Sequence, residues 1–250
     1  MKFFFCLLFL SSLSLADTKL LLIGGGKRPV AAMKEFSRLA GGDKARILVI
    51  PWASESTAAA EAIKAELAIH TQGEIEIIPH VLSVNEVKNL TKKLESSSGI
   101  FFTGGDQNRL MSLMKTYQLR NTFRSKFFEG VIFGGTSAGT AIMSNPMLTG
   151  SADLTVLDGT QVELAEGLGL LPPSIIVDQH FIVRSRFNRL AGLILNNKAQ
   201  IGIGVDENTS LLIRDREAKV IGPSQVLIFK RLKSNQLNVI VLEPQAKYSI

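Results

Sequence analysis

The sequence is poor in cysteine and histidine. Its 250 residues include one cysteine, Cys6, and three histidines. Cys6 lies within the apolar run FFFCLLFLSSLSLA, which ends at Ala16. If that run is removed, the rest of the chain has no disulfide, no thiolate metal site and no cysteine nucleophile. Covalent catalysis by residues 17–250 would then have to use a hydroxyl group.

The apolar run has the length of a secretory signal peptide. Lys2 precedes it, and Ser14-Leu15-Ala16 gives the small-x-small pattern of a cleavage site. The run is short for a transmembrane helix, which needs about 20 apolar residues. Cys6 lies inside the run rather than at a lipoprotein cleavage site. We therefore predict a signal peptide at residues 1–16, and a secreted or periplasmic protein with no membrane anchor after cleavage.

Charge is spread along the chain without a lysine- or arginine-rich block. There are 28 basic and 22 acidic residues, a net charge of +6. We find no nucleic-acid-binding motif and expect no nucleic-acid partner. The histidines, His70, His80 and His180, lie too far apart to show a metal-ligand spacing. We expect neither a metal nor a cofactor.

Short apolar runs alternate with segments of helical periodicity in the first two-thirds of the chain. The predicted strands are 20–23, 47–50, 75–78, 100–102 and 131–133, with helices near 30–40, 56–70, 85–95 and 107–117. This alternation predicts a parallel sheet covered by helices on both faces. Later β runs at 201–205, 209–213, 218–221, 225–230 and 237–242 predict antiparallel strands at one edge. The predicted fold is one three-layer α/β domain, residues 17–250.

Three glycine-rich turns follow predicted strands, where binding sites form in open α/β sheets. They are GGGKRP at 24–29, TGGDQN at 103–108 and GGTSAG at 134–139. The first turn lacks the third glycine of the dinucleotide-binding motif G-x-G-x-x-G. Tight backbone packing, or contact with an acidic substrate group, is therefore the better interpretation of that turn.

Ser137 stands at the centre of a G-x-S-x-G pattern in the third turn. Small flanking residues allow a strand-turn-helix elbow that exposes a serine hydroxyl. In that arrangement the N–H of Ala138, with one from Gly104 or Gly105, would stabilise an oxyanion. The alternative is a small-residue turn with an incidental serine.

His180 is the predicted base for this serine. His70 ends a predicted helix among polar residues, and His80 follows a strand without polar neighbours. His180 instead lies in IIVDQHFIVRSRFNRL, where a strand is expected to open into a helix that bears three arginines. Asp206 and Glu207 follow another strand and are the candidate acids. Because side chains alternate along a strand, one can face the site while the other caps a turn or meets solvent.

Four segments together resemble the cyanophycinases, serine peptidases of family S51. They are TGGDQNRL, GTSAGTAIMS, LGLLPPSIIVDQHFIVRSRFNRL and GIGVDENTSLL, within a resemblance that runs from about Leu20 to Leu212. The resemblance implies a flavodoxin-like α/β/α fold related to class I glutamine amidotransferases. It also implies Ser137 as the nucleophile, His180 as the base and Glu207, rather than Asp206, as the acid. Thr140 and Pro172-Pro173 depart from the family pattern but occupy no catalytic position.

The same resemblance implies a substrate and a pocket. The pocket residues that match are Gln107, Asp178, Gln179, Arg184, Arg186 and Arg189. The implied activity of the homodimer is hydrolysis of cyanophycin, a polyaspartate with arginine on each β-carboxyl, to β-Asp-Arg through an acyl-enzyme. Arg186 or Arg189 would bind a substrate carboxylate, and Asp178 a substrate arginine. The alternatives are an aspartyl or isoaspartyl dipeptidase of the same family, and a non-enzymatic amidotransferase-like binding protein.

Overall fold

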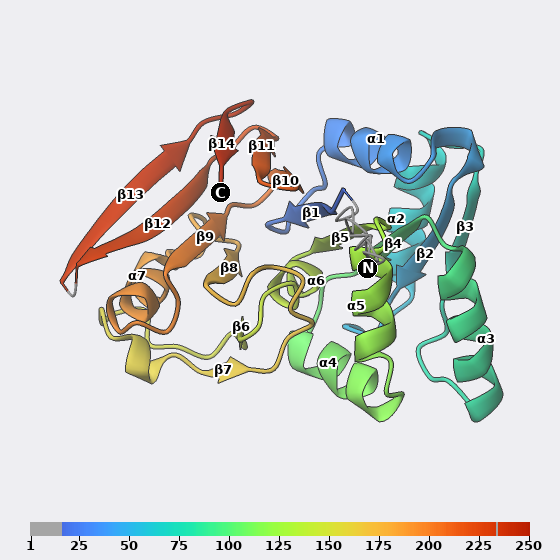
Figure 1. Cartoon of the computed structure of the whole chain (residues 1–250), viewed down its shortest axis with the longest axis horizontal. Helices are drawn as coiled ribbons and strands as arrows, with labels where there is room; N and C mark the ends of the chain where they lie inside the picture. The colour runs from blue at the N-terminus through green and yellow to red at the C-terminus, as the bar shows by residue number, and fades with distance from the viewer. Residues whose placement is uncertain (1–16, 234) are drawn as a thin grey trace, which may run out of the picture.

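The computed structural model describes residues 17–233 and 235–250, whose two larger sheets lie side by side (Figure 1). The predicted signal peptide, residues 1–16, lies outside the described residues. Within the part of the chain that is described, no helix is long and apolar enough to cross a membrane.

The first sheet has a parallel half and an antiparallel half. The parallel strands are β1 (Lys19–Ile23), β2 (Arg46–Ile50), β3 (Glu74–Ile77), β4 (Gly99–Phe102) and β5 (Ile132–Thr136). The antiparallel strands are β10 (Ser210–Arg214), β11 (Glu217–Ile221) and β14 (Lys247–Ser249). The spatial order is β14-β11-β10-β1-β5-β4-β2-β3, so the antiparallel strands extend the sheet beyond β1.

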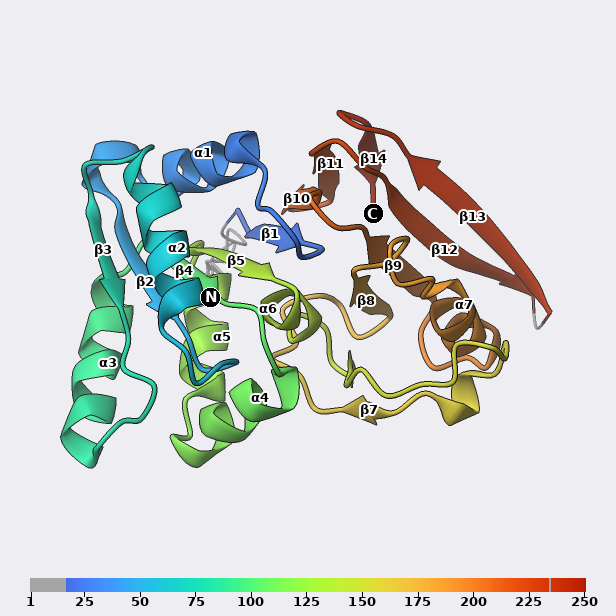
Figure 2. The same cartoon turned by 180° about the vertical axis from the view of Figure 1, so that it is seen from behind.

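Helices cover both faces of the parallel half (Figures 1 and 2). They are α1 (Val30–Leu39) and α2 (Ala58–Ala68) on one face, and α3 (Val84–Ser96), α4 (Gln107–Thr116) and α5 (Arg120–Phe128) on the other. Successive side chains of a strand point to opposite faces. Leu21 and Ile23 of β1 accordingly share a core with α1 and α2, while Leu20 and Leu22 pack on the side of α3, α4 and α5. The predicted three-layer arrangement is confirmed.

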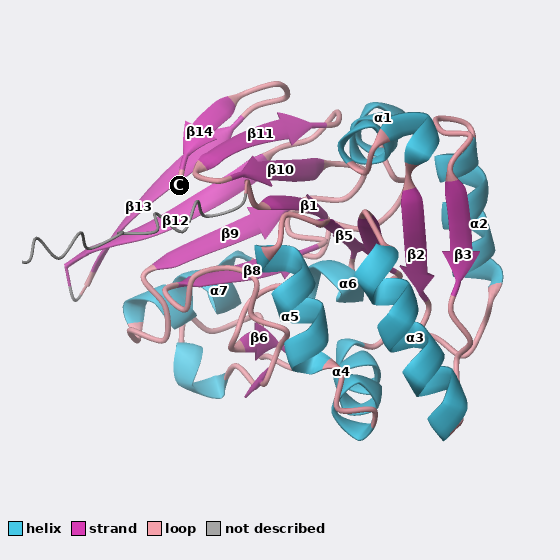
Figure 3. Ribbon diagram, turned by 45° about the vertical axis from the view of Figure 1, so that its right-hand side comes forward, coloured by secondary structure: helices cyan, strands magenta, loops and turns pink. Residues whose placement is uncertain are grey.

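A second sheet contains β8 (Ile175–Gln179), β9 (Ile201–Val205), β12 (Val226–Lys233) and β13 (Gln236–Leu242), in the order β13-β12-β9-β8. Helix α7 (Phe187–Leu195) covers one face, where Leu190 and Leu193 pack with Ile176. Val177 and Ile203, on the other face, join the main core. The hairpin of β12 and β13 extends away from the helical layers (Figure 3).

The prediction that all the late strands extend one edge was wrong in part. Only 209–213 and 218–221 join the first sheet, whereas 201–205, 225–230 and 237–242 form the second sheet with β8. The physical reason is that β9 pairs in parallel with β8, in the register Gln179↔Val205. Strand spacing along the sequence does not reveal such a partner.

Several short elements also escaped the sequence analysis. They are β6 (Met147–Leu148), β7 (Leu164–Ala165) and the 3₁₀ turns Gly42–Lys44 and Gly159–Gln161, together with the longer helix α5 and strand β14. The short helix α6 (Ala138–Ala141) follows Ser137, as the strand-turn-helix elbow predicts. The two-stranded sheet of β6 and β7 forms part of the segment between Ser137 and β8. What matters for the site is that β1, β4 and β5 are parallel neighbours, so their carboxyl ends lie together.

Candidate active site

Ser137 occupies a sharp elbow between β5 and α6. Its φ of 52° and ψ of −112° lie in a region that residues with a side chain rarely adopt. The flanking glycines make the elbow possible, because a Cβ on Gly135 would lie 2.2 Å from the carbonyl oxygen of Gly139. Tight packing on both sides therefore forces the turn and leaves the serine side chain half-buried at the strand end.

The structure brings Ser137, His180 and Glu207 together as a hydrogen-bonded relay. His180 Nε2 lies 2.7 Å from Ser137 Oγ, and His180 Nδ1 lies 2.5 Å from Glu207 Oε1. With a proton on Nδ1, the ring donates to Glu207, and Nε2 can accept the serine proton. Ser137 comes from the first sheet, whereas His180 follows β8 and Glu207 follows β9 of the second. The two sheets thus meet at the relay.

Burial sets the acid-base behaviour of His180. The residue is 6% exposed, and this desolvation is the main reason that its pKa lies below the usual value of 6.5. The hydrogen bond to Glu207 opposes the shift, and the positive charge of Arg184 adds to it. Because a base must be neutral, the lowered pKa keeps His180 competent below the pH at which a solvated histidine would protonate.

The end of β1 holds all three segments of the relay through consecutive carbonyl groups. Ser137 N–H donates to the Ile23 carbonyl at 3.0 Å, and His180 N–H donates to the Gly24 carbonyl at 2.7 Å. The next carbonyl, of Gly25, accepts the N–H of Asn208, the residue after Glu207, at 2.9 Å. The prediction of tight backbone packing for the Gly24–Gly26 turn is therefore confirmed.

Asp206, the other candidate acid, faces away from the relay. Its Oδ1 accepts the N–H groups of Ile182 and Val183 at 2.9 and 3.1 Å, and its Oδ2 accepts the Ser224 hydroxyl at 2.6 Å. Of the two adjacent carboxylates, Glu207 thus reaches His180, while Asp206 stabilises the turn that follows His180. The alternation argument left the choice open, and the structure places Glu207 beside His180.

The turn after β4 lies beside Ser137. A Cβ on Gly104 would lie 3.3 Å from Ser137 Cβ, which puts the Gly104–Gly105 backbone next to Ser137. Within residues 17–233 and 235–250, the N–H groups of Gly104, Gly105 and Ala138 donate to no protein acceptor. These donors are thus available for an oxyanion, which is the role predicted for them.

The predicted substrate-binding residues at the end of β8 form an internal network. Arg189 is 1% exposed and pairs with Asp178 through two hydrogen bonds, one of 2.7 Å from Nε. Arg186 donates to the carbonyl and side-chain oxygens of Gln179 at 2.7 and 2.6 Å. Burial lowers the pKa of Arg186 to about 10, so it stays charged near neutral pH. Asp178 and Arg189 could reach a substrate only by opening their own pair, so their substrate contacts stay a prediction.

Gln107 also bonds within the chain. Its side-chain amide donates to the carbonyls of Leu148 and Thr149, and Arg189 donates to the carbonyl of Gly150, the next residue, at 3.3 Å. Two of the predicted pocket residues therefore fix the strand that follows the elbow. Arg184, by contrast, is exposed, and its Nε lies 3.9 Å from Glu207 Oε1.

The expected helix with three arginines is shorter than predicted. Helix α7 begins at Phe187, so it carries Arg189 alone, and Arg184 and Arg186 lie in the preceding turn. The reason is the local backbone: His180 and Ser185 both have positive φ, and Asp206 captures N–H groups of the turn. The turn before α7 therefore does not adopt a helical conformation, and the helix begins only after Arg186.

The histidines set aside in the sequence analysis do not join the relay. The histidine of the relay is His180, whose ring hydrogen-bonds to Ser137 and Glu207. Across the described part of the chain, no group of His, Cys, Asp or Glu side chains has the arrangement of a metal site.

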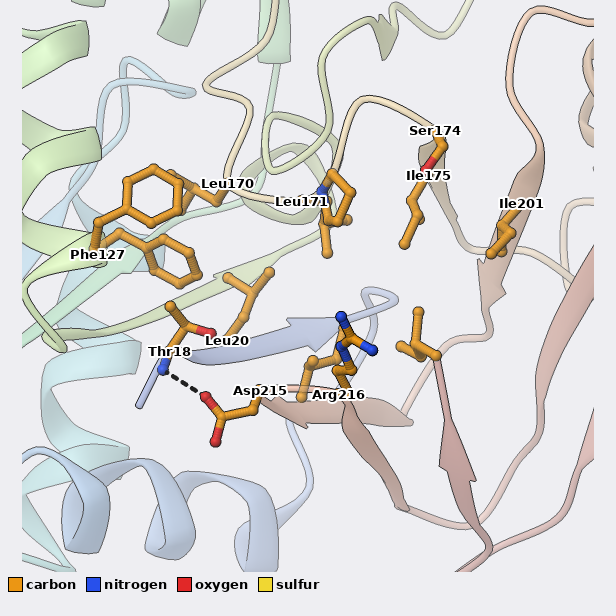
Figure 4. A pocket seen from close by; sticks show the side chains of 14 residues that line it. Thr18, Leu20, Phe127, Leu170, Leu171, Ser174, Ile175, Ile201, Asp215 and Arg216 are labelled. Carbon is orange, nitrogen blue, oxygen red and sulfur yellow. Dashed lines mark hydrogen bonds between the residues drawn. The ribbon is translucent and has the colours of Figure 1, made fainter. Parts of the chain in front are cut away.

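A separate cavity of about 370 Å³ lies at the opposite ends of the strands (Figure 4). Leu20 near the start of β1, Ile175 at the start of β8 and Ile201 at the start of β9 line it. At its edge the Thr18 N–H donates to the Asp215 carboxylate at 3.2 Å. Because Ser137 and His180 follow the carboxyl ends of β5 and β8, this apolar cavity is distinct from the relay.

Comparison with known proteins decides the family. The model for peptidase family S51 matches residues 20–221. The chain belongs to peptidase family S51. It is a serine-type peptidase, and the prediction of an enzyme rather than a binding protein is confirmed.

Two S51 relatives that carry the name cyanophycinase match most of the chain. The protein from Geminocystis herdmanii is 34% identical over 220 residues, 84% of this chain and 80% of its own length. The protein from Synechococcus elongatus is 33% identical over 241 residues, 91% of this chain and 74% of its own. Peptidase E from Pasteurella multocida is 27% identical over 157 residues, 60% of this chain and 64% of its own.

Solved structures agree on the S51 fold. A peptidase from an acI-B1 Actinobacterium superposes with a TM-score of 0.69 at 22% identity, covering 94% of this chain and 98% of its own. A protein described as a putative peptidase E from Listeria monocytogenes gives 0.60 at 20% identity, covering 84% of this chain and all of its own. The α/β fold is therefore shared beyond the range of clear sequence identity.

Two supporting side chains of this S51 peptidase were not predicted from its sequence. Asn208, which follows Glu207, accepts the Lys27 N–H at 2.7 Å through its side chain and so ties the β1 turn to the acid segment. Thr140 donates to the Ile23 carbonyl at 2.7 Å and accepts the Ile23 N–H at 3.0 Å. In the sequence, Thr140 stands out only as a departure from the family pattern. The one feature that could have pointed to its contact with Ile23 is the expected proximity of the two turns.

We expect Arg184→Ala to move the acid limb of the pH profile of kcat/KM to higher pH. The variant removes a positive charge that lowers the pKa of His180, so the base protonates at a higher pH. Peptide hydrolysis measured across pH tests this, and Arg184→Lys, which keeps the charge, should leave the limb in place. A limb that stays fixed or moves to lower pH in Arg184→Ala contradicts the assignment.

Proposed function

We propose that this S51 peptidase hydrolyses cyanophycin to β-Asp-Arg dipeptides by an acyl-enzyme mechanism. The observation that carries the proposal is the Ser137–His180–Glu207 relay, with bonds of 2.7 and 2.5 Å, beside unoccupied backbone N–H donors. Support for the substrate comes from the relatives named cyanophycinase, which match 84% and 91% of the chain.

The first half-reaction forms an ester on Ser137. Its Oγ attacks the backbone carbonyl carbon as its proton passes to His180 Nε2, 2.7 Å away. The negative oxygen of the tetrahedral intermediate is stabilised by the N–H groups of Ala138 and the Gly104–Gly105 turn. The C–N bond then breaks as His180 returns the proton to the leaving amine. Glu207 stays ionised and stabilises the charged imidazole.

The second half-reaction hydrolyses that ester. A water molecule attacks the acyl carbon while His180 Nε2 accepts its proton, and the same N–H groups stabilise the new oxyanion. The C–O bond to Ser137 breaks, and the proton on His180 returns to the serine. The product carboxylic acid is released as a carboxylate, and the relay is restored. No step requires a group beyond these side chains, backbone donors and water.

The positive charge near the relay suits an aspartate-rich substrate. Arg184 is exposed beside Glu207, and Arg186 remains charged behind it. An exposed guanidinium can bind a carboxylate in a bidentate pair. We propose that Arg184 makes the first such contact, while the buried Asp178–Arg189 pair shapes the pocket wall unless substrate opens it.

A dipeptidase is the second candidate, because peptidase E proteins also resemble the chain. Their 27% identity extends over 60–62% of this chain, less than for the proteins named cyanophycinase. An aspartyl or isoaspartyl dipeptidase would use the same relay on a shorter substrate. Substrate length therefore separates the two candidates.

Incubation with purified cyanophycin should release soluble β-Asp-Arg, and Ser137→Ala should lower the rate by about 10³-fold or more, since the nucleophile is lost. The products are measured by liquid chromatography with mass spectrometry. Asp-Arg and isoaspartyl dipeptides, assayed in parallel, serve as the competing substrates. An enzyme that cleaves the dipeptides and leaves the polymer intact is a dipeptidase. Full activity of Ser137→Ala would refute the nucleophile.

We also propose that the chain is exported, because residues 3–16 have the pattern of a signal peptide. Fractionation of producing cells should recover the protein in the periplasm or medium, beginning near Asp17. N-terminal sequencing checks the cleavage site. Protein that stays in the cytoplasm with residues 1–16 attached would contradict export.

The homodimer implied by the resemblance remains part of the proposal. β13 is an edge strand whose residues, Gln236–Leu242, carry no charge, and such an edge can pair with a second chain. Light scattering distinguishes a dimer from a monomer of about 27 kDa.

A further inference from the structure

The Gly24–Gly26 turn packs against three different parts of the site. A Cβ on Gly24 would lie 2.1 Å from the Asp206 carbonyl oxygen, and one on Gly26 would lie 2.7 Å from Asn208 Oδ1. A Cβ on Gly25 would lie 2.1 Å from Cε1 of His180. All three distances are shorter than a carbon atom tolerates, so an added Cβ would displace the Asp206 backbone, the His180 ring or the Asn208 side chain.

Gly25 differs from the other two glycines because the three atoms nearest to its added Cβ all belong to the His180 ring. The three atoms nearest to its added Cβ are Cε1, Nε2 and Nδ1 of His180, at 2.1, 2.5 and 2.7 Å. Nε2 is the atom that hydrogen-bonds to Ser137, and Nδ1 is the atom that hydrogen-bonds to Glu207. The backbone of Gly25 thus packs against the edge of the imidazole that contains Cε1 and both nitrogen atoms.

The contact with Gly25 is important because His180 has an unusual backbone conformation, which does not by itself fix the position of its ring. His180 has a φ of 51°, and its N–H is tied to the Gly24 carbonyl at 2.7 Å. The same turn therefore sets both the backbone and the ring of the base. A methyl group on Gly25 would displace the ring. The ring could then no longer hydrogen-bond to both Ser137 and Glu207.

We propose that Gly25 is a positioning residue for catalysis: it holds the His180 imidazole between Ser137 and Glu207. The proposal rests on the catalytic role proposed above for His180. A displacement on the order of 1 Å in a catalytic group can cost about 10²-fold in rate. The effect should fall on kcat, because the ring moves protons rather than holding the substrate.

The first test compares Gly25→Ala with Gly41→Ala. The two glycines have nearly the same φ, 110° and 113°, but a Cβ on Gly41 meets nothing closer than 3.6 Å. The pair therefore matches in φ and differs in the contact that an added Cβ would make. We expect Gly25→Ala to lower kcat by about 10²-fold with KM within about 3-fold, and Gly41→Ala to change kcat by less than about 2-fold. Equal losses in the two variants, or a kcat within about 3-fold of wild type for Gly25→Ala, would overturn the proposal.

The second test needs no activity and uses His180→Ala, which removes the ring that Gly25 contacts. In the wild-type background, Gly25→Ala should lower Tm by more than Gly41→Ala does. In the His180→Ala background the cost of Gly25→Ala should fall, while that of Gly41→Ala stays the same, because no ring remains to meet the methyl group on Gly25. An undiminished cost of Gly25→Ala there would refute the contact. This outcome is independent of the reaction, so it separates failure of the positioning role from failure of the proposed peptidase mechanism.

Discussion

The active site depends on three consecutive carbonyl groups at the end of β1. Those of Ile23, Gly24 and Gly25 accept hydrogen bonds from Ser137, from His180 and from Asn208, which follows the acid. Each donor comes from a different part of the chain, and two of them follow strands of the second sheet. One short stretch of backbone therefore sets the distances within the relay. Side chains at 24–26 would block this approach, which explains why three glycines stand there.

His180 and Glu207 follow two strands of the second sheet, and charged side chains are buried beside them. Asp206 holds the turn after His180, and the Asp178–Arg189 pair, at 0% and 1% exposure, fills the space between β8 and the segment after the elbow. A buried pair of this kind is strongly destabilised when one partner is removed. Alanine substitutions of Asp178 or Arg189 would therefore disturb the fold as well as any substrate contact. Arg184, exposed beside Glu207, lacks that complication.

Much of the fold could be predicted from local sequence. Continuous apolar runs located β1, β2, β4 and β5, and the turns after them marked the site because parallel strands share an edge. The second sheet was not predicted, since strand spacing does not reveal that β9 pairs with β8 rather than with β10. Glu207 was chosen over Asp206 by resemblance alone. The pairing of Asp178 with Arg189 also escaped prediction, because residue types near a strand end do not reveal their mutual distance.

We propose that Ser137 is a nucleophile activated by the His180–Glu207 pair. The most direct measurement is labelling of the purified protein with a fluorophosphonate, followed by peptide mass spectrometry, because such probes react with activated serines. We expect a single adduct on the peptide that contains Ser137, formed much more slowly when His180 is replaced by alanine. An unlabelled wild-type protein, or an adduct on another residue, would contradict it.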